Sequence, residues 1–215
     1  MLHKATVILL ALLAATVWAQ EKAPAPPAPS YEALLAELKG GKTDIDFYAL
    51  RMAYTATKDY EPYGSADEET RKAMFTALSD KDYAEAQKQA QKALAKDYLD
   101  ARAHAVAGIA AEHLGDKEQA GFHRAVALGL IRSIFHAGDG HTLETAGEVI
   151  STDEEYAYFE LAGYRPKDQA LVHQGGHSYD KMVVVDSDSQ QEVTFYFLID
   201  KPMQHLEDSL KPEKK

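Results

Sequence analysis

Residues 82–94, DYAEAQKQAQKAL, and residues 116–128, DKEQAGFHRAVAL, carry small and apolar side chains at matching positions. Three pairs match at a constant spacing of 34 residues: Ala86 with Ala120, Ala93 with Ala127, and Leu94 with Leu128. A repeat of about 20–50 residues is typical of supersecondary units that bury one face against their neighbours. The sequence therefore predicts a body of packed helix pairs joined through a stripe of small side chains.

Around these residues the chain resembles tetratricopeptide repeats, whose helix pair recurs about every 34 residues. The turn Leu114-Gly115-Asp116 and the alanine positions carry the resemblance. Tyr98 departs from the pattern because it stands where a closing Pro is usual, and Arg124 stands where an aromatic residue is usual. About two units are visible, whereas a solenoid generally has three or more. The alternative is an ordinary helical bundle whose small-residue stripes coincide at this spacing.

Capping residues and apolar periodicity predict the remaining helices of this region. Ser30 caps a first helix that ends at Gly40 and Gly41. Thr43 starts a second helix, which stops before Pro62 because the residue preceding a proline disfavours helix. Four further helices are expected, over residues 65–79, 83–96, 101–114 and 117–135.

The pattern changes after Pro166, where the apolar period shifts from 3.6 to 2. Before this point we expect a loop over residues 136–141, a short helix over about residues 143–150 and a helix over residues 151–163. Strands are expected over residues 169–173, 179–185 and 192–200. The last strand places four apolar residues on one face: Val193, Phe195, Phe197 and Ile199.

These elements predict an α+β fold. A tetratricopeptide-like helical body over residues 30–135 is followed by a small C-terminal antiparallel β-sheet or hairpin. This sheet belongs to an α/β module over residues 136–202 that packs on the helices, since a bare two-stranded ribbon is marginal in water. Residues 203–215 are expected to be a frayed, charged tail.

The first nineteen residues have the features of a secretory signal peptide. His3 and Lys4 precede an apolar run from Ala5 to Val17, and cleavage is expected after Ala19. An uncleaved anchor helix is the alternative, although the run is shorter than the ~20 residues of a membrane span. Residues 20–29 form a Pro/Ala linker, which is either a semi-rigid spacer or a disordered tail. The sequence thus predicts an exported protein, periplasmic or extracellular, with no stable membrane span after cleavage.

Composition limits the possible partners. The chain has a formal net charge of −11, and removing residues 1–19 makes it −12 because Lys4 is their only charged residue. Such a surface repels nucleic acid and anionic lipid, which both depend on cationic contacts. The chain has no Cys, so disulfides and lipid attachment at a processed Cys are excluded.

A second resemblance spans about residues 43–200. It is carried by several segments that occur in order: Phe47-Tyr48-x-Leu50-Arg51, Tyr60-x-Pro62-Tyr63, Gly138-Asp139-Gly140, Val149-Ile150-Ser151, Glu154-Glu155-Tyr156 and Tyr179-Asp180. In these segments the chain is similar to a family of exported bacterial proteins of about this size, classed as a domain of unknown function. The resemblance implies no activity.

The candidate chemical groups are few. His173 and His177 are weak candidates for a metal site, which needs three or four ligands, and surface or turn histidines are the alternative. The loop Gly138-Asp139-Gly140-His141 is either an anion-binding or catalytic loop or a tight inter-module turn. Four tyrosines crowd one segment, where they either line a groove for a peptide or sugar or lock the third helix onto the second: Tyr48, Tyr54, Tyr60 and Tyr63.

Motifs of the commonest hydrolases are absent from the sequence, which has no Gly-x-Ser-x-Gly and no His-Glu-x-x-His. The sequence therefore favours a binding or scaffolding protein of the cell envelope, without a cofactor, over an enzyme. The concave side of the helix pairs would contact a peptide or protein partner. The residues expected on this surface are Tyr83, His104, Glu112 and Arg124, with the 138–141 loop as a further site. The alternative is a small metal-dependent or hydrolytic enzyme that uses this loop with His173 and His177.

Overall fold

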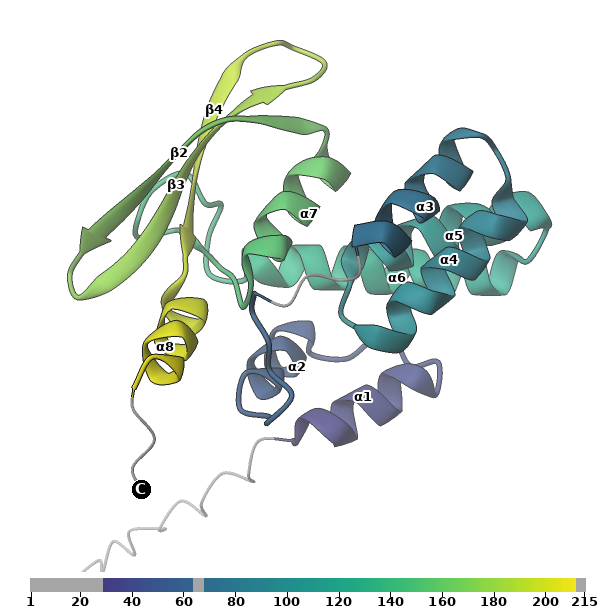
Figure 1. Cartoon of the computed structure of the whole chain (residues 1–215), viewed down its shortest axis with the longest axis horizontal. Coiled ribbons are helices and arrows are strands. Elements are labelled where there is room, and N and C mark those ends of the chain that lie inside the picture. Colours follow the sequence, from purple (N-terminus) through teal and green to yellow (C-terminus); the bar gives the residue numbers. More distant parts are fainter. Residues whose placement is uncertain (1–28, 64–67, 212–215) are drawn as a thin grey trace, which may run out of the picture.

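The computed structural model describes residues 29–63 and 68–211, which form eight helices and a four-stranded sheet (Figure 1). The helices are α1 (Tyr31–Lys39), α2 (Phe47–Tyr54), α3 (Glu68–Ser79), α4 (Tyr83–Lys96), α5 (Ala101–Leu114), α6 (Lys117–Ile134), α7 (Thr152–Ala162) and α8 (Asp200–Ser209). The strands are β1 (Gly147–Glu148), β2 (Tyr164–Gln174), β3 (His177–Asp186) and β4 (Glu192–Leu198). The predicted α+β class is confirmed. The proposed signal segment and the expected helix start at Ser65 lie outside the described residues.

Aspartate side chains begin most of the helices of the body. Asp82 and Asp116 accept hydrogen bonds from the backbone N–H groups of Glu85 and Gln119, so each satisfies a donor that has no partner within its helix. The second helix begins at Phe47 rather than at Thr43, because Asp46 is its cap. Local capping chemistry thus sets these boundaries.

The four helices α3 to α6 pack in chain order, with α4 against both α3 and α5, and α6 against α5 (Figure 1). Ala86 and Ala120 are buried, and so are Ala93 and Ala127. Gly108 permits the close approach of α5 to α6, since a Cβ there would lie 3.3 Å from the backbone nitrogen of Arg124. The small-residue stripe is therefore a packing surface, as its spacing predicts.

The sheet has the strand order β1-β4-β3-β2. β2, β3 and β4 are antiparallel, but β1 pairs parallel with β4, so the sheet is mixed and the expectation of a purely antiparallel sheet is wrong. The helix expected over about residues 143–150 is also wrong. Thr142 and Thr145 hydrogen-bond to each other's backbone N–H groups, which competes with helical bonding, and residues 147–148 join the sheet instead.

The core of the C-terminal module lies between the sheet and α7. Phe195, Phe197 and Ile199 are buried on the predicted face of β4, and Phe159 of α7 packs against them. Figure 1 shows α7 between the sheet and the helical body. α7 therefore serves as the layer that joins the two halves of the chain.

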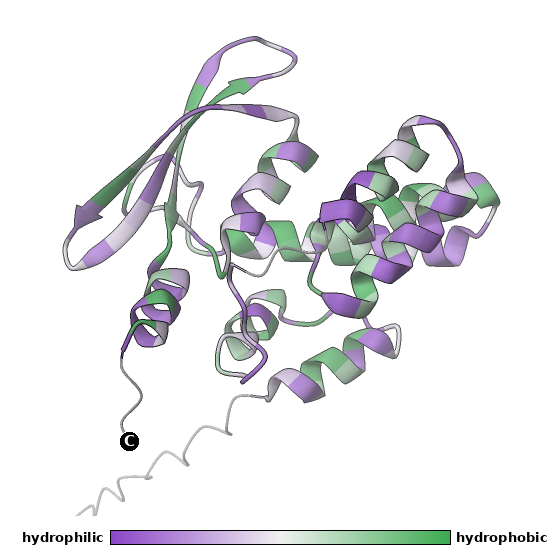
Figure 2. Ribbon diagram, viewed as in Figure 1, coloured by the Kyte–Doolittle hydropathy of each residue, from purple (hydrophilic) through white to green (hydrophobic). Residues whose placement is uncertain are grey.

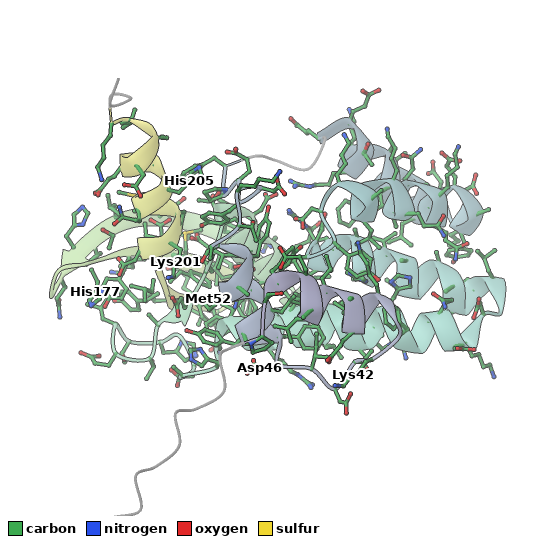
Figure 3. The ribbon with its side chains drawn as sticks, turned by 90° about the horizontal axis from the view of Figure 1, so that it is seen from below. Lys42, Asp46, Met52, His177, Lys201 and His205 are labelled. Atoms are coloured by element: carbon green, nitrogen blue, oxygen red, sulfur yellow. The ribbon has the colours of Figure 1, made fainter. Side chains whose placement is uncertain are left out.

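The expected C-terminal tail is wrong as far as Ser209, because residues 200–209 form helix α8. Hydrophobic and hydrophilic positions alternate around this helix (Figure 2). Pro202 is buried in its first turn, where a proline is tolerated, and Met203 packs against the core of the sheet. His205 packs edge-on against Tyr60, and Figure 3 shows it on the side of α8 that faces the helical body.

A buried arginine joins α2 to α6, to the segment before α7 and to the first turn of α7. The Arg51 side chain is fully buried, and its Nε and Nη2 donate to the two carboxylate oxygens of Glu154, each at 2.6 Å. Nη2 also donates to the carbonyl of Glu148 at 2.7 Å, and Nη1 donates to Ser133 of α6 at 3.3 Å. The backbone N–H of Ile150 donates to the same carboxylate at 2.8 Å. The polar atoms of this charge pair therefore find their hydrogen-bond partners within the protein.

The crowded tyrosines strengthen the same junction. Tyr48 donates its hydroxyl to Glu148 at 2.7 Å, and Tyr60 donates to the carbonyl of Ile150 at 2.7 Å. The ring of Tyr54 contacts the rings of both Tyr31 and Tyr60. These tyrosines therefore tie α1 and α2 to residues 148–150, rather than α3 to α2 as one interpretation of the sequence expected.

Replacing Arg51 with leucine is expected to lower the free energy of unfolding by about 3–5 kcal/mol, because Glu154 then loses its charge partner. Urea denaturation followed by circular dichroism measures this loss. Lys58→Ala is the matched control, since it breaks an exposed pair with Asp59 and should cost less than about 1 kcal/mol. A similarly small loss for Arg51→Leu would contradict the importance of the buried pair.

Candidate functional site

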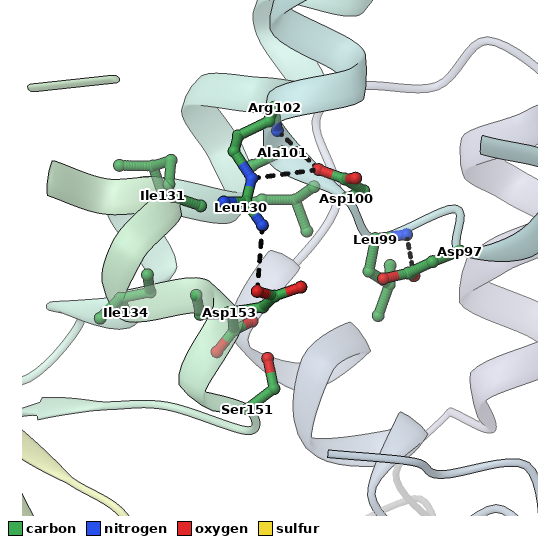
Figure 4. Close-up of a pocket in the computed structure, with 12 residues that line it drawn as sticks. Asp97, Leu99, Asp100, Ala101, Arg102, Leu130, Ile131, Ile134, Ser151 and Asp153 are labelled. Carbon is green, nitrogen blue, oxygen red and sulfur yellow. Dashed lines mark hydrogen bonds and ion pairs between the residues drawn. The ribbon is translucent and has the colours of Figure 1, made fainter. Parts of the chain in front are cut away.

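A cluster of charged side chains holds α7 against α3 and α5. Arg102 is buried, and its guanidinium lies 3.2 Å from Asp153 and 3.6 Å from Glu160 (Figure 4 draws the Asp153 pair). Arg71 of α3 reaches the other oxygen of Asp153 at 2.5 Å. Both arginines are therefore neutralised by carboxylates of α7. The cluster of Arg71, Arg102, Asp153 and Glu160, called the latch below, connects α7 to α3 and α5.

Two cavities adjoin this latch. The smaller one, drawn in Figure 4, has a volume of about 30 Å³, which suits a water molecule and not a metabolite. The other is an open cleft of about 490 Å³ that Arg165, Tyr156 and Tyr164 line together with the latch. Because Arg71 and Arg102 already bind carboxylates, an anion entering the cleft would have to compete with Asp153 and Glu160.

A pair of buried carboxyl groups lies where α7 packs on the sheet. Glu155 of α7 is fully buried, and neither of its oxygens meets an N–H or hydroxyl donor of the described residues. Burial is the main cause that raises the pKa of Glu155 to about 9, and the charge of Asp180 on β3 is the second. Glu155 is therefore neutral at pH 7 and hydrogen-bonds to Asp180. Two carboxyl groups that share one proton can act as an acid and a base.

The surroundings of this pair are polar on one side. Gln169 of β2 donates to Asp180 at 2.8 Å and accepts from the hydroxyl of Tyr156 at 3.2 Å. Burial raises the pKa of Asp180, whereas the hydrogen bonds from Gln169 and Glu155 lower it. The pair thus extends by hydrogen bonds to an exposed tyrosine at the edge of the cleft.

A separate apolar groove runs along the helical body. It has a volume of about 490 Å³ and lies between α5, α6 and the C-terminal end of α7. Its exposed apolar residues come from all three helices: Ile109, Leu128 and Leu161. Arg124 and Arg132 of α6 also line it and are exposed. A concave apolar surface with a few charged groups is the usual form of a binding site.

The groove lies at the end of the row of helices from α3 to α6. Leu94 of α4 is 7% exposed because α5 packs over it. Leu128, 34 residues later on α6, is 43% exposed, although Ala93 and Ala127 beside these leucines are both buried. The apolar face that a neighbouring helix covers on α4 is therefore open on α6.

Two of the four residues predicted on the binding surface form an exposed pair, because Arg124 lies 3.5 Å from Glu112 across α5 and α6. Tyr83, the first residue of α4, stacks on His113 in the last turn of α5 with ring centroids 3.9 Å apart. Only Arg124 of this set lines the groove. The role of these three residues in binding stays a prediction.

The expectation that His104 lies on the binding surface is wrong, because its side chain is fully buried. Nε2 is 3.1 Å from the carbonyl of Tyr98, which can only accept, so Nε2 carries the hydrogen. Nδ1 then accepts from Nδ1 of His123 at 2.8 Å. Burial lowers the pKa of His104 to about 3. This neutral histidine pair therefore packs α5 against α6.

The loop over residues 138–141 is bound to the sheet. The Asp139 carboxylate accepts from the N–H of His141 and the hydroxyl of Thr145, which lower its pKa. The carbonyl of Gly140 accepts from the N–H of Tyr196 on β4 at 2.7 Å. The polar groups of the loop are thus used within the fold, as in an inter-module turn, and its role as a functional site stays a prediction.

The two candidate metal ligands lie at the tip of the β2–β3 hairpin, but on opposite faces of it. Gly175 and Gly176 form a two-residue turn in which both have positive φ, so His177 pairs with Gln174 and His173 pairs with Ser178. Their side chains therefore point to opposite faces of the hairpin. Figure 3 shows His177 far from the helical body, and it lies 2.5 Å from Asp200. Within residues 29–63 and 68–211, no three potential metal ligands gather.

The sequence contained a signal for the carboxyl pair that its interpretation missed. Glu155 lies four residues before Phe159, so helical periodicity places both on one face of α7. A glutamate on an apolar stripe indicates either a partner or a raised pKa. The groove was harder to find, because Ile109 and Leu161 are ordinary apolar residues until packing leaves them uncovered.

Comparison with protein-family models gives a match over residues 35–208 to a family described as "Domain of unknown function (DUF4919)". The matched region holds the buried arginine, the carboxyl pair and the groove. Comparison with curated proteins and with solved structures gives no match.

Replacing Glu155 with glutamine is expected to make the protein more stable at pH 8 than the wild type. The folded wild type keeps a proton on Glu155 up to about pH 9, whereas the unfolded chain loses it near pH 4.5. Its stability therefore falls between these values, by up to about 1.4 kcal/mol per pH unit. Urea denaturation at pH 5, 6.5 and 8 measures the slope.

Glu118→Gln, on an exposed turn of α6, is the matched control and should keep the slope of the wild type. An unchanged slope in Glu155→Gln would show that Glu155 is ionised in the folded protein.

Proposed function

The chain belongs to the DUF4919 family, a domain of unknown function, and we propose that it is a binding or scaffolding module that docks a helix of a protein partner. The site is the groove between α5, α6 and α7. The observation that carries this proposal is the exposure of Leu128, whose counterpart Leu94 is covered by the next helix.

The shape of the groove supports a helix as the occupant. From α3 to α6 each helix lies against the one before it, through stripes of small and apolar side chains. At the end of the array this surface is open on α6, while α7 bounds it with Leu161 and Ala162. An amphipathic helix of a partner would continue the same packing, with two or three apolar side chains in the groove.

The charges around the groove support an acidic partner. Arg132 is exposed, and Arg124 makes an exposed pair with Glu112, which contributes little and is easily exchanged. Carboxylates that flank the apolar face of a partner helix would therefore find two guanidinium groups. In a chain with a formal charge of −11, such a basic edge adds specificity and orientation.

We also propose that the protein is exported to the periplasm or beyond, on the basis of residues 1–19, and that its partner belongs to the cell envelope. The described helices include none that is both long and apolar enough to cross a bilayer. The tetratricopeptide-like character of α3 to α6 is likewise a proposal, and the 34-residue spacing supports it.

A synthetic helix tests the groove directly. The probe is a fluorescein-labelled alanine-based peptide of about 16 residues, with two leucines four positions apart and glutamates on either side. Fluorescence anisotropy should show saturable binding to the protein, at least tenfold weaker for Leu128→Glu. Leu171→Glu, on an exposed position of β2 outside the groove, should bind as the wild type does.

A probe in which alanine replaces both leucines should bind at least tenfold more weakly than the original. Equal binding of the two peptides, or of wild type and Leu128→Glu, would rule out the groove as a helix-docking site.

A further inference from the structure

Helix α8 carries an apolar stripe that its own chain covers only in part. The stripe starts with the buried Pro202 and with Met203, which packs against the core of the sheet. It continues at helical spacing through Leu206 to Leu210, the C-cap residue of the helix. Leu206 is 38% exposed, and Leu210, at 75%, is the most exposed large apolar side chain among the described residues. The stripe therefore extends beyond the core that anchors it.

The edge of this stripe is acidic. Glu207 follows Leu206 directly and is exposed, and Asp208 lies on the next position, where Lys211 contacts it at 2.6 Å. Two leucines four positions apart with carboxylates beside them are the complement of an apolar groove edged by Arg124 and Arg132. The chain thus contains both a groove and a helix of matching chemistry.

The two surfaces do not meet within one molecule. α8 packs against β3 and lies at the lower end of the sheet in Figure 1, nearer to α2 than to α5 and α6. The buried Ile199 connects it to β4 without a linker, so α8 cannot swing across to its own groove while the sheet is intact. α8 can therefore fill this groove only in another molecule.

We propose that the helix bound in the groove is α8 of a second copy of this chain, with Leu206 and Leu210 between α6 and the end of α7. This inference rests on the proposed function, because it names the partner of the same groove. Two copies related by a twofold axis would each donate α8 to the other, which fills both grooves and closes the assembly. The carboxylates of Glu207 and Asp208 would then face Arg124 and Arg132.

Sedimentation velocity of the purified protein tests whether two copies bind each other through α8. The wild type should form a dimer. Leu128→Glu, which places a charge in the apolar groove, should be a monomer at the same concentration. Leu210→Glu, which places a charge on the apolar stripe of α8, should also be a monomer. Both positions are exposed in the single chain, so circular dichroism should show unchanged folding. Leu171→Glu is the control and should remain a dimer.

Mixing the two monomeric variants gives the decisive measurement. The intact α8 of the Leu128→Glu chain can enter the intact groove of the Leu210→Glu chain, so the mixture should contain a heterodimer that neither variant forms alone. Arg132→Glu should weaken the dimer at least tenfold, and adding Glu207→Lys to the same chain should restore part of the loss.

A wild type that stays monomeric, or a dimer that Leu210→Glu leaves intact, would overturn the proposal that α8 of a second copy fills the groove. In either case, if the synthetic acidic helix still binds the wild type and not Leu128→Glu, the proposed function stands with a different protein as the partner. If the probe fails as well, both proposals fail.

Discussion

The arrangement of the two halves of this protein depends on one buried charge pair. Arg51 has no access to solvent, and a guanidinium in such a place is tolerated only when its donors are bound. Glu154 takes two of them in a bidentate pair, and its position fixes the first turn of α7 against α2 and α6. Because α7 is the layer between the helices and the sheet, the orientation of the whole C-terminal module follows from this pair.

Two adjacent glutamates on α7 have opposite environments for this reason. The turn that directs Glu154 towards Arg51 directs Glu155 towards the sheet, where it meets Asp180 instead of a cation. A carboxyl group that loses water without gaining a positive partner keeps its proton. The sequence Glu154-Glu155 therefore holds one charge-paired carboxylate and one neutral acid side by side, and the difference comes entirely from the packing around each.

Local patterns predicted a large part of the fold. Helix caps such as Asp82 and Asp116, and the alternation of Phe195 and Phe197, depend on interactions within a few residues, so the sequence alone contains them. Contacts between distant segments were not predictable in this way. The parallel pairing of β1 and the burial of His104 depend on where other elements come to lie. Of the candidate site, the stripe of small residues was evident, but the exposure of Leu128 was not.

That exposure follows from the end of the row of packed helices at α6. Each helix of a stacked array presents one apolar face to the helix before it and another to the helix after it, so the last helix has a face without a partner. Arrays usually end in a helix whose outer face is polar, and α7 supplies only part of such a cover through Leu161 and Ala162. A face of this kind either limits solubility or is used for association. The acidic, leucine-bearing end of α8 is the counterpart of this face in charge and in helical spacing, which makes association the simpler explanation for both surfaces.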